Sequence, residues 1–415
     1  MSRQSMVSDM SSPGPNPAAA TDDDEPTPPF FNTTFSTHRV SPLYVGPEKL
    51  TSPRLEVLGR RLRDTLVGDV VRGIQIGLES TDTPAGQVGA LRSVKLRWFR
   101  ANTVLGDEVD GGNGGGDDDD VWDSLSESQK QGLWIEIRHE NAAYIALLLP
   151  GVGIKDNSKA ATWQMQPDKA SSQPNVNTSH FVHLPLLLLR MPLPLKHVIG
   201  EWLSTTFDCR VSKLSLGTKT IVNVWEDWIR TVGIRSKGAD FVVTLAFNAP
   251  LPDPSVEVNP DADAEDNGDE SKSGLRSLDI TIQPQDLRRF VRAGKGLAHR
   301  PRSTGASWES DVRERRRLAG GNSDDGWAWL SAADAASQPF MDALARYLDH
   351  HLALNVFHPS VRVVQVSCGG YILASSRLKI VRQGDMSDDL SRAAWMFVTR
   401  LGQRIGGEAL PTIFT

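Results

Sequence analysis

Two small groups of side chains in the sequence have atoms that could bind a metal ion. His180 and His183 are spaced H-x-x-H, and Asp349, His350 and His351 are adjacent. The first pair stands in or beside a predicted strand, where residues three apart face opposite sides. The second group has no further ligand at a useful spacing. The sequence therefore predicts no metal site and no cofactor.

The sequence also lacks the usual patterns of covalent and phosphate chemistry. The Gly-rich run 111–116 precedes four Asp residues rather than a Lys and a helix, so it would repel a phosphate. There is no G-x-S-x-G nucleophile elbow, and neither Cys209 nor Cys368 stands in a nucleophile motif. Two cysteines cannot form a disulfide framework, which fits a reducing compartment. We expect no enzymatic activity and no small-molecule substrate.

A basic segment at 288–317 is the most informative charged feature. It holds ten Lys and Arg against three acids, and clustered cations of this kind bind phosphates by releasing counterions. The segment fits a DNA contact, a nuclear import signal at RERRR, or an ordinary solvated surface. The candidate DNA-contact residues are Arg288, Arg289, Arg292, Lys295, Arg315, Arg316 and Arg317.

The formal net charge of −6 hides a strong segregation of charge along the chain. Of the 51 acids, 18 stand in the runs 22–25, 107–123 and 261–270, which contain no Lys or Arg. The other 33 acids are outnumbered by the 45 Lys and Arg, so the predicted folded part is basic. Acidic, Gly-rich runs are typical of solvated linkers, and a basic core suits a nucleic acid or an acidic protein partner.

Hydrophobic periodicity predicts the helices and strands that must position these groups. The predicted helices cover about 52–66, 194–207 and 218–229, one opened by Pro284, one around 340–348, and one capped by Ser387 and closed by Gly406. The predicted strands lie at 31–46, 74–78, 94–98, 133–140 and 142–151, from 181 onward, and at 209–216, 239–250, 278–284, 361–366 and 371–381. Strands outnumber regular crossovers, which favours an α+β class with largely antiparallel sheets over a doubly wound fold.

Composition divides the chain into folded parts separated by acidic or Gly/Pro-rich stretches that we expect to be disordered. The predicted parts are a leader at 1–29, an N-terminal α+β part at 30–154, a linker at 155–179, a central strand-helix part at 180–249, an acidic linker at 250–275 and a C-terminal α+β part at 276–415. The most apolar run, 181–195, is broken by prolines and is too short to cross a bilayer, so we expect no membrane segment.

The segments 361–366 and 371–381 form a predicted hairpin around Gly369-Gly370. They are long, rich in β-branched residues and weakly charged. Such strands would pair with another chain if they lay at an exposed sheet edge. The alternative is a hairpin buried in the middle of a sheet.

Two stretches of the sequence resemble a known family. The first is TTFSTHRVSPLYVG at 33–46, which a Leu/Arg helix follows. The second is HFVHLPLLLLRMPLPLKHVIGEWLSTTFDCRVSKLSL at 180–216, with Trp202 in its helix. Both are similar to blocks of the centromere protein L family, and the likeness continues in order to the final helix. With its long insertions, the chain is most similar to the fungal branch of that family.

The resemblance implies a non-enzymatic subunit of the inner kinetochore, in the constitutive centromere-associated network of the nucleus, that serves chromosome segregation. It implies α+β architecture with curved, mainly antiparallel sheets. It also implies a basic channel, formed with a partner, for centromeric DNA or nucleosomes, which would give the segment 288–317 a purpose. The alternative function is a nuclear protein that binds DNA directly through that segment.

The partner that the resemblance implies is a CENP-N-like subunit, bound through sheet residues near the C-terminal end of the chain. This favours the exposed-edge interpretation of the predicted hairpin. The corresponding interface residues are Arg362, Val364, Val366, Tyr371 and Leu373.

Overall fold

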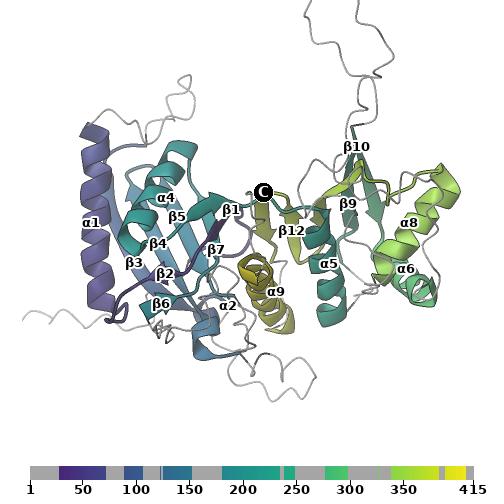
Figure 1. Cartoon of the computed structure of the whole chain (residues 1–415), viewed down its shortest axis with the longest axis horizontal. Coiled ribbons are helices and arrows are strands. Elements are labelled where there is room, and N and C mark those ends of the chain that lie inside the picture. The colour runs from purple at the N-terminus through teal and green to yellow at the C-terminus, as the bar shows by residue number, and fades with distance from the viewer. Residues whose placement is uncertain are drawn as a thin grey trace, which may run out of the picture.

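Figure 1 shows the computed structural model of the chain. The residues that it describes are 28–71, 88–105, 122, 125–151, 180–233, 238–247, 276–297, 327, 338–382 and 388–407. Helices and a large antiparallel sheet are both present, which confirms the predicted α+β class. No described helix is long and apolar enough to cross a membrane.

One large sheet runs through the molecule, and every strand pair in it is antiparallel. Its strands follow one another in the order β10 (Ser277–Ile282), β9 (Phe241–Phe247), β11 (Val361–Ser367), β12 (Tyr371–Ala374), β13 (Arg377–Ile380), β1 (Thr34–Val40), β7 (Leu186–Arg190), β5 (Ala143–Leu149), β4 (Gln131–His139) and β3 (Leu91–Arg100). A short strand, β8 (Val211–Lys213), pairs with β1 outside this order. The strands β2 (Leu43–Tyr44) and β6 (Phe181–Val182) form a separate two-stranded ribbon.

The first strand of the chain lies near the middle of the sheet. β1 pairs with β7 on one side, and with β13 and β8 on the other. Phe35 points into the core with 2% of its surface exposed. Beyond Val40, the backbone turns at Ser41-Pro42 and continues as β2. The apolar opening stretch therefore joins the N-terminal and C-terminal halves of the sheet.

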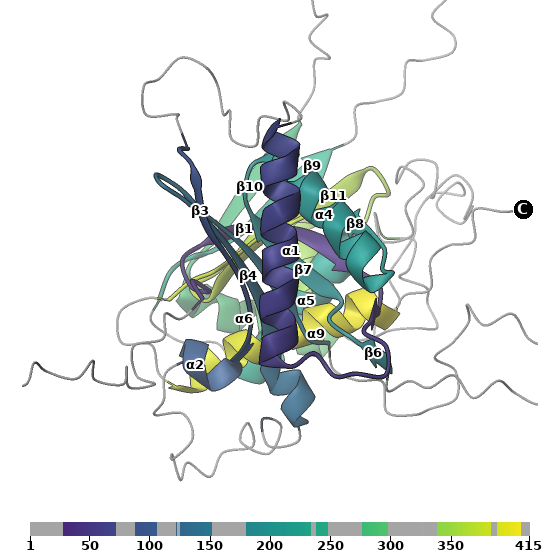
Figure 2. The ribbon, with the colours of Figure 1, turned by 90° about the vertical axis from the view of Figure 1, so that its left-hand side faces the viewer.

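The helices cover the sheet unevenly (Figures 1 and 2). Their bounds are α1 (Ser52–Val71), α2 (Ala101–Leu105), α4 (Leu193–Phe207), α5 (Thr218–Val232), α6 (Pro284–Leu297), α8 (Pro339–Leu352) and α9 (Asp388–Gly407), with a 3-10 turn at Glu127–Lys130.

Around β7 the sheet is packed on both faces, so the side chains of this strand alternate between two cores. Leu186 and Leu188 join the core of α5 and α9, whereas Leu187 and Leu189 join the core of α1 and α4.

The helices α6 and α8 lie side by side at one end of the molecule, and we call this pair the α6–α8 arm (Figure 1). They cross so closely at Gly294 that a Cβ atom there would lie 1.6 Å from the carbonyl oxygen of Pro339. Only glycine fits at such a crossing. The arm is anchored to the core by Phe340, whose ring meets those of Trp225 and Phe241 at 5.6 and 5.1 Å.

The predicted helices are confirmed, with differences of a few residues at their ends. Three predicted strands are divided, and the first of them, 31–46, forms β1 and β2 around Ser41-Pro42. The segment 371–381 forms β12 and β13 around a turn at Ser375-Ser376, and the segment from 181 forms β6 and β7. The predicted strand at 74–78 and the predicted cap Ser387 lie outside the described residues.

Candidate interaction surfaces

The predicted partner-interface residues lie in the interior strands β11 and β12. Val366, Tyr371 and Leu373 are at most 2% exposed and belong to the main core. Arg362 and Val364 are partly exposed. The ladder with β9 shifts register between Val363 and Gln365, which interrupts the simple alternation that the sequence suggested. The prediction that this hairpin is an exposed edge is wrong, because β11 pairs with β9, and β12 with β13.

The sheet ends instead at β10 and β3. On β10, the amide of Phe247 donates to the carbonyl of Arg276 at 3.0 Å, so residues 276, 278, 280 and 282 direct their backbone groups toward β9. The amide and carbonyl groups of Ser277, Asp279 and Thr281 therefore point away from the sheet. No described strand pairs with that side of β10.

The two ends of the sheet differ in charge. β3 has the sequence LRSVKLRWFR, with four cations, whereas β10 has the sequence SLDITI, with none. Lys and Arg on an edge strand discourage pairing with another chain. β10 is therefore the end better suited to accept a further strand.

Three cations form a row beside β1, and we call Lys213, Arg377 and Lys379 the basic row. They pair across the sheet with His38, Ser36 and Thr34 respectively. These three β1 residues alternate along the strand and share one face, so the cations follow one another in steps of about 7 Å. Lys213 and Arg377 are exposed and Lys379 is partly so.

The pKa of His38 reflects its burial and the positive charge of this region. Its pKa is lowered, first by burial, and then by the charges of Lys196 and Lys213, against a backbone hydrogen bond at Ser36 that raises it. Imidazole beside lysines favours its neutral form. Sequence reasoning missed this site because its cations come from strands far apart in the chain. The alternating pattern of Arg377-Leu378-Lys379 was the one local signal.

The predicted DNA-contact residues of α6 lie on a different surface. Arg288, Arg289, Arg292 and Lys295 are exposed, and Arg289 pairs with Asp286 at 2.9 Å. The inner side of α6 packs with the main core through Leu287 and Phe290. Arg315, Arg316 and Arg317 lie outside the described residues.

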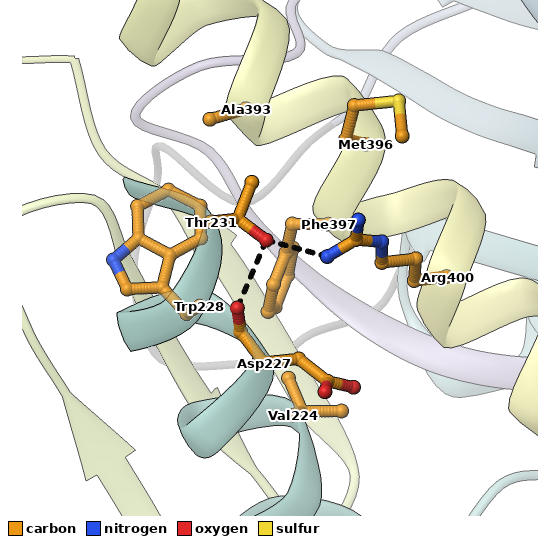
Figure 3. A pocket seen from close by; sticks show the side chains of 8 residues that line it. All are labelled: Val224, Asp227, Trp228, Thr231, Ala393, Met396, Phe397 and Arg400. Carbon is orange, nitrogen blue, oxygen red and sulfur yellow. Dashed lines mark hydrogen bonds between the residues drawn. The ribbon is translucent and has the colours of Figure 1, made fainter. Parts of the chain in front are cut away.

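A small hollow opens between α5 and α9 (Figure 3). It is lined by Val224, Asp227, Trp228 and Thr231 of α5 and by Ala393, Met396, Phe397 and Arg400 of α9. Its polar groups bond to one another. Arg400 donates to the Thr231 hydroxyl at 2.5 Å, that hydroxyl donates to the Asp227 carbonyl at 2.9 Å, and Arg404 pairs with the Asp227 carboxylate. The Thr231 hydroxyl therefore donates to a backbone carbonyl and not to the Asp227 carboxylate, which Arg404 engages.

The histidine groups do not assemble into a metal site. Among the described residues, no cluster of three His, Cys, Asp or Glu could hold an ion. His180 lies near the ring of Tyr44, at 6.4 Å, and the rings of His350 and His351 are in edge contact at 4.8 Å. The pKa of His183 is lowered by burial and by the charge of Arg39, which would disfavour a second positive charge at that point.

Comparison with known proteins gives one strong result. The chain matches the family model described as Centromere protein L over residues 29–409. No match was found among curated proteins. The matched range contains the whole sheet, the α6–α8 arm and the basic row.

Proposed function

Since the chain belongs to the centromere protein L family, whose members are structural kinetochore proteins and not enzymes, we propose that it is a scaffold subunit of the inner kinetochore. In this role it joins a CENP-N-like subunit in the constitutive centromere-associated network and helps that network hold centromeric chromatin. The observation that carries the proposal is the outer side of β10, with which no described strand pairs, at the end of a sheet that runs through the molecule.

The partner adds a strand to β10. Three residues, Ser277, Asp279 and Thr281, offer their amide and carbonyl groups to it, and no cation on β10 opposes its approach. Main-chain hydrogen bonds would supply affinity in this mode, while side chains on the two faces supply specificity. A stable interface of this kind buries on the order of 1,600 Å², so neighbouring elements must also take part.

A proline at an outward-facing position tests this interface. Thr281→Pro removes one amide that a partner strand would use, and it leaves the ladder with β9 intact. The matched control, Thr281→Val, keeps the amide. In size-exclusion chromatography at micromolar concentration, the wild-type chain and Thr281→Val should co-elute with a CENP-N homologue, while Thr281→Pro should elute separately.

Two results would count against the proposal. If Thr281→Pro is folded and still co-elutes with the partner, β10 is not the joining edge. If the wild-type chain does not bind the homologue at all, the heterodimer itself is wrong.

Direct nucleic-acid binding is the second candidate, and the basic row favours it. Cations in regular steps on a sheet face can follow a phosphate backbone, and each neutralised phosphate makes binding more sensitive to salt. The α6 cations offer a separate surface of the same charge. Duplex DNA of about 30 base pairs would bind the purified chain, with affinity falling steeply between 50 and 200 mM salt.

Two triple variants distinguish the surfaces. Alanine at Lys213, Arg377 and Lys379 should lower the salt slope by about three, whereas alanine at Arg288, Arg292 and Lys295 should leave it nearly unchanged. The reverse pattern would move the contact to α6. Equal binding by wild type and both variants would exclude both surfaces.

A further inference from the structure

The first turn of α8 is capped by a side chain from another helix. Gln338 stands at the N-cap, but its side chain makes no capping hydrogen bond. The amides of Phe340 and Met341 donate instead to Oε1 of Glu226, at 3.1 and 3.2 Å. Glu226 lies on α5, 114 residues before Phe340, and is 1% exposed. A buried carboxyl therefore takes the place of the usual local cap.

The surroundings of Glu226 do not favour a charge. The charged groups that act on it are Arg230 on its own helix and Asp342 on α8. Arg230 is 66% exposed and pairs with Asp227 at 3.0 Å, while Asp342 repels a carboxylate. Burial is the largest effect and raises the pKa of Glu226 to about 7, although the amides of Met341 and Phe340 lower it.

The same contact holds the α6–α8 arm to the body of the protein. Beside Glu226, the Gln338 side-chain amide donates to Asn223 at 2.7 Å. The ring of Phe340 packs edge-on against Trp225. The backbones of α6 and α8 are in close contact where Gly294 crosses Pro339. A movement of the first turn of α8 would therefore move α6 and its cations as well.

We propose that Glu226 is a proton-sensitive latch, which docks the arm when protonated and loosens it when ionised. A carboxyl released into water ionises near pH 4.5, whereas the docked one holds its proton to about pH 7. Docking therefore takes up a proton, and the docked state weakens as pH rises between these two values. The difference corresponds to roughly 300-fold in the docking equilibrium, of which about threefold falls between pH 6.5 and 7.5.

Hydrogen exchange of the full chain at pH 6 and pH 8 tests the latch. After correction for the intrinsic pH dependence of exchange, protection of the amides of the first turn of α8 should be about tenfold lower at pH 8. In Glu226→Gln, which cannot ionise, protection should be the same at both pH values. Peptides from the β4–β5 hairpin serve as the internal reference and should not change.

Three outcomes would overturn the proposal. The first is equal protection of α8 at both pH values in the wild-type chain, a comparison that does not depend on the variant folding. The second is a pH dependence that survives in Glu226→Gln. The third is a parallel loss of protection in the β4–β5 reference, because that would make Glu226 a determinant of global stability and not a latch.

Discussion

The crossing of α6 and α8 at Gly294 can be tested by adding a single methyl group. In Gly294→Ala the new Cβ would lie 1.6 Å from the carbonyl oxygen of Pro339, and 2.3 and 2.7 Å from its carbonyl carbon and Cα. All three atoms are backbone atoms, which cannot rotate away as a side chain can. The helices must separate by more than an ångström, and the packing around Phe340 must follow.

The size of the effect follows from two opposing contributions. Overpacking of a close contact lowers the free energy of unfolding by about 1–3 kcal/mol. Replacing glycine by alanine inside a helix raises it by up to about 1 kcal/mol. Gly296, two residues further along α6, provides the control, because a Cβ there meets nothing within 4 Å. Gly296→Ala should gain up to about 1 kcal/mol without cost. We therefore expect the two variants to differ by about 1–3 kcal/mol in unfolding free energy.

Urea unfolding followed by tryptophan fluorescence measures this difference, since Trp225 lies at the joint between the arm and the core. Gly294→Ala should have a lower midpoint than the wild type, and Gly296→Ala an equal or higher one. Equal midpoints for the two variants would show that the helices do not approach each other as closely as the structure has them.

Other substitutions test the core and the capping contacts. The buried amide of Val363 donates to the Thr218 hydroxyl at 3.1 Å, and Thr218→Val removes that acceptor. We expect this variant to lower the free energy of unfolding in urea by about 1–3 kcal/mol. The control Thr244→Val, on the exposed side of β9, should lower it by less. Phe35→Ala should cost about 3–5 kcal/mol, because it empties the core beneath β1, and a cost below 1 kcal/mol would contradict the placement of this strand. For Glu226, whose pKa in the folded chain is raised to about 7, the contribution to docking of the arm is present below about pH 4.5 and is lost as pH rises to 7. The first turn of α8 should therefore be better protected from hydrogen exchange in Glu226→Gln than in the wild type at pH 8, and most of that difference should be gone by pH 5.

Most helices and several strands could be predicted because their apolar residues repeat at the period of the element. The alternation of Val94, Leu96 and Trp98 identified β3, and the spacing of Leu55, Leu58 and Leu62 identified α1. The turn between β12 and β13 could not be predicted in this way. Ser375 and Ser376 are polar residues in an otherwise alternating run. A turn at these residues can be recognised only when the pairing of β12 with β13 is known.

The interaction surfaces were less accessible to sequence reasoning. A clustered run such as the one on α6 can be recognised in the sequence, so its cations were predicted as DNA contacts, and the structure places them on an exposed surface. The basic row was not nominated, because Lys213 lies 164 residues before Arg377, and only the pairing of β1 with two strands brings them together. Glu226 was missed for the same reason, since its acceptor role depends on amides 114 residues away.

Which segments form helices and strands, and where charge excludes burial, could be predicted from the amino-acid sequence because these properties depend on neighbours within a few residues. The sequence also indicated the family, through the opening stretch at 33–46 and the block at 180–216. Which strand is central and which is an edge became clear only from the pairing of the strands in the folded chain. A β-branched, weakly charged strand looks the same in either place, and its position depends on which strands pair with it. That order places β11 and β12 inside the sheet and leaves β10 at its end.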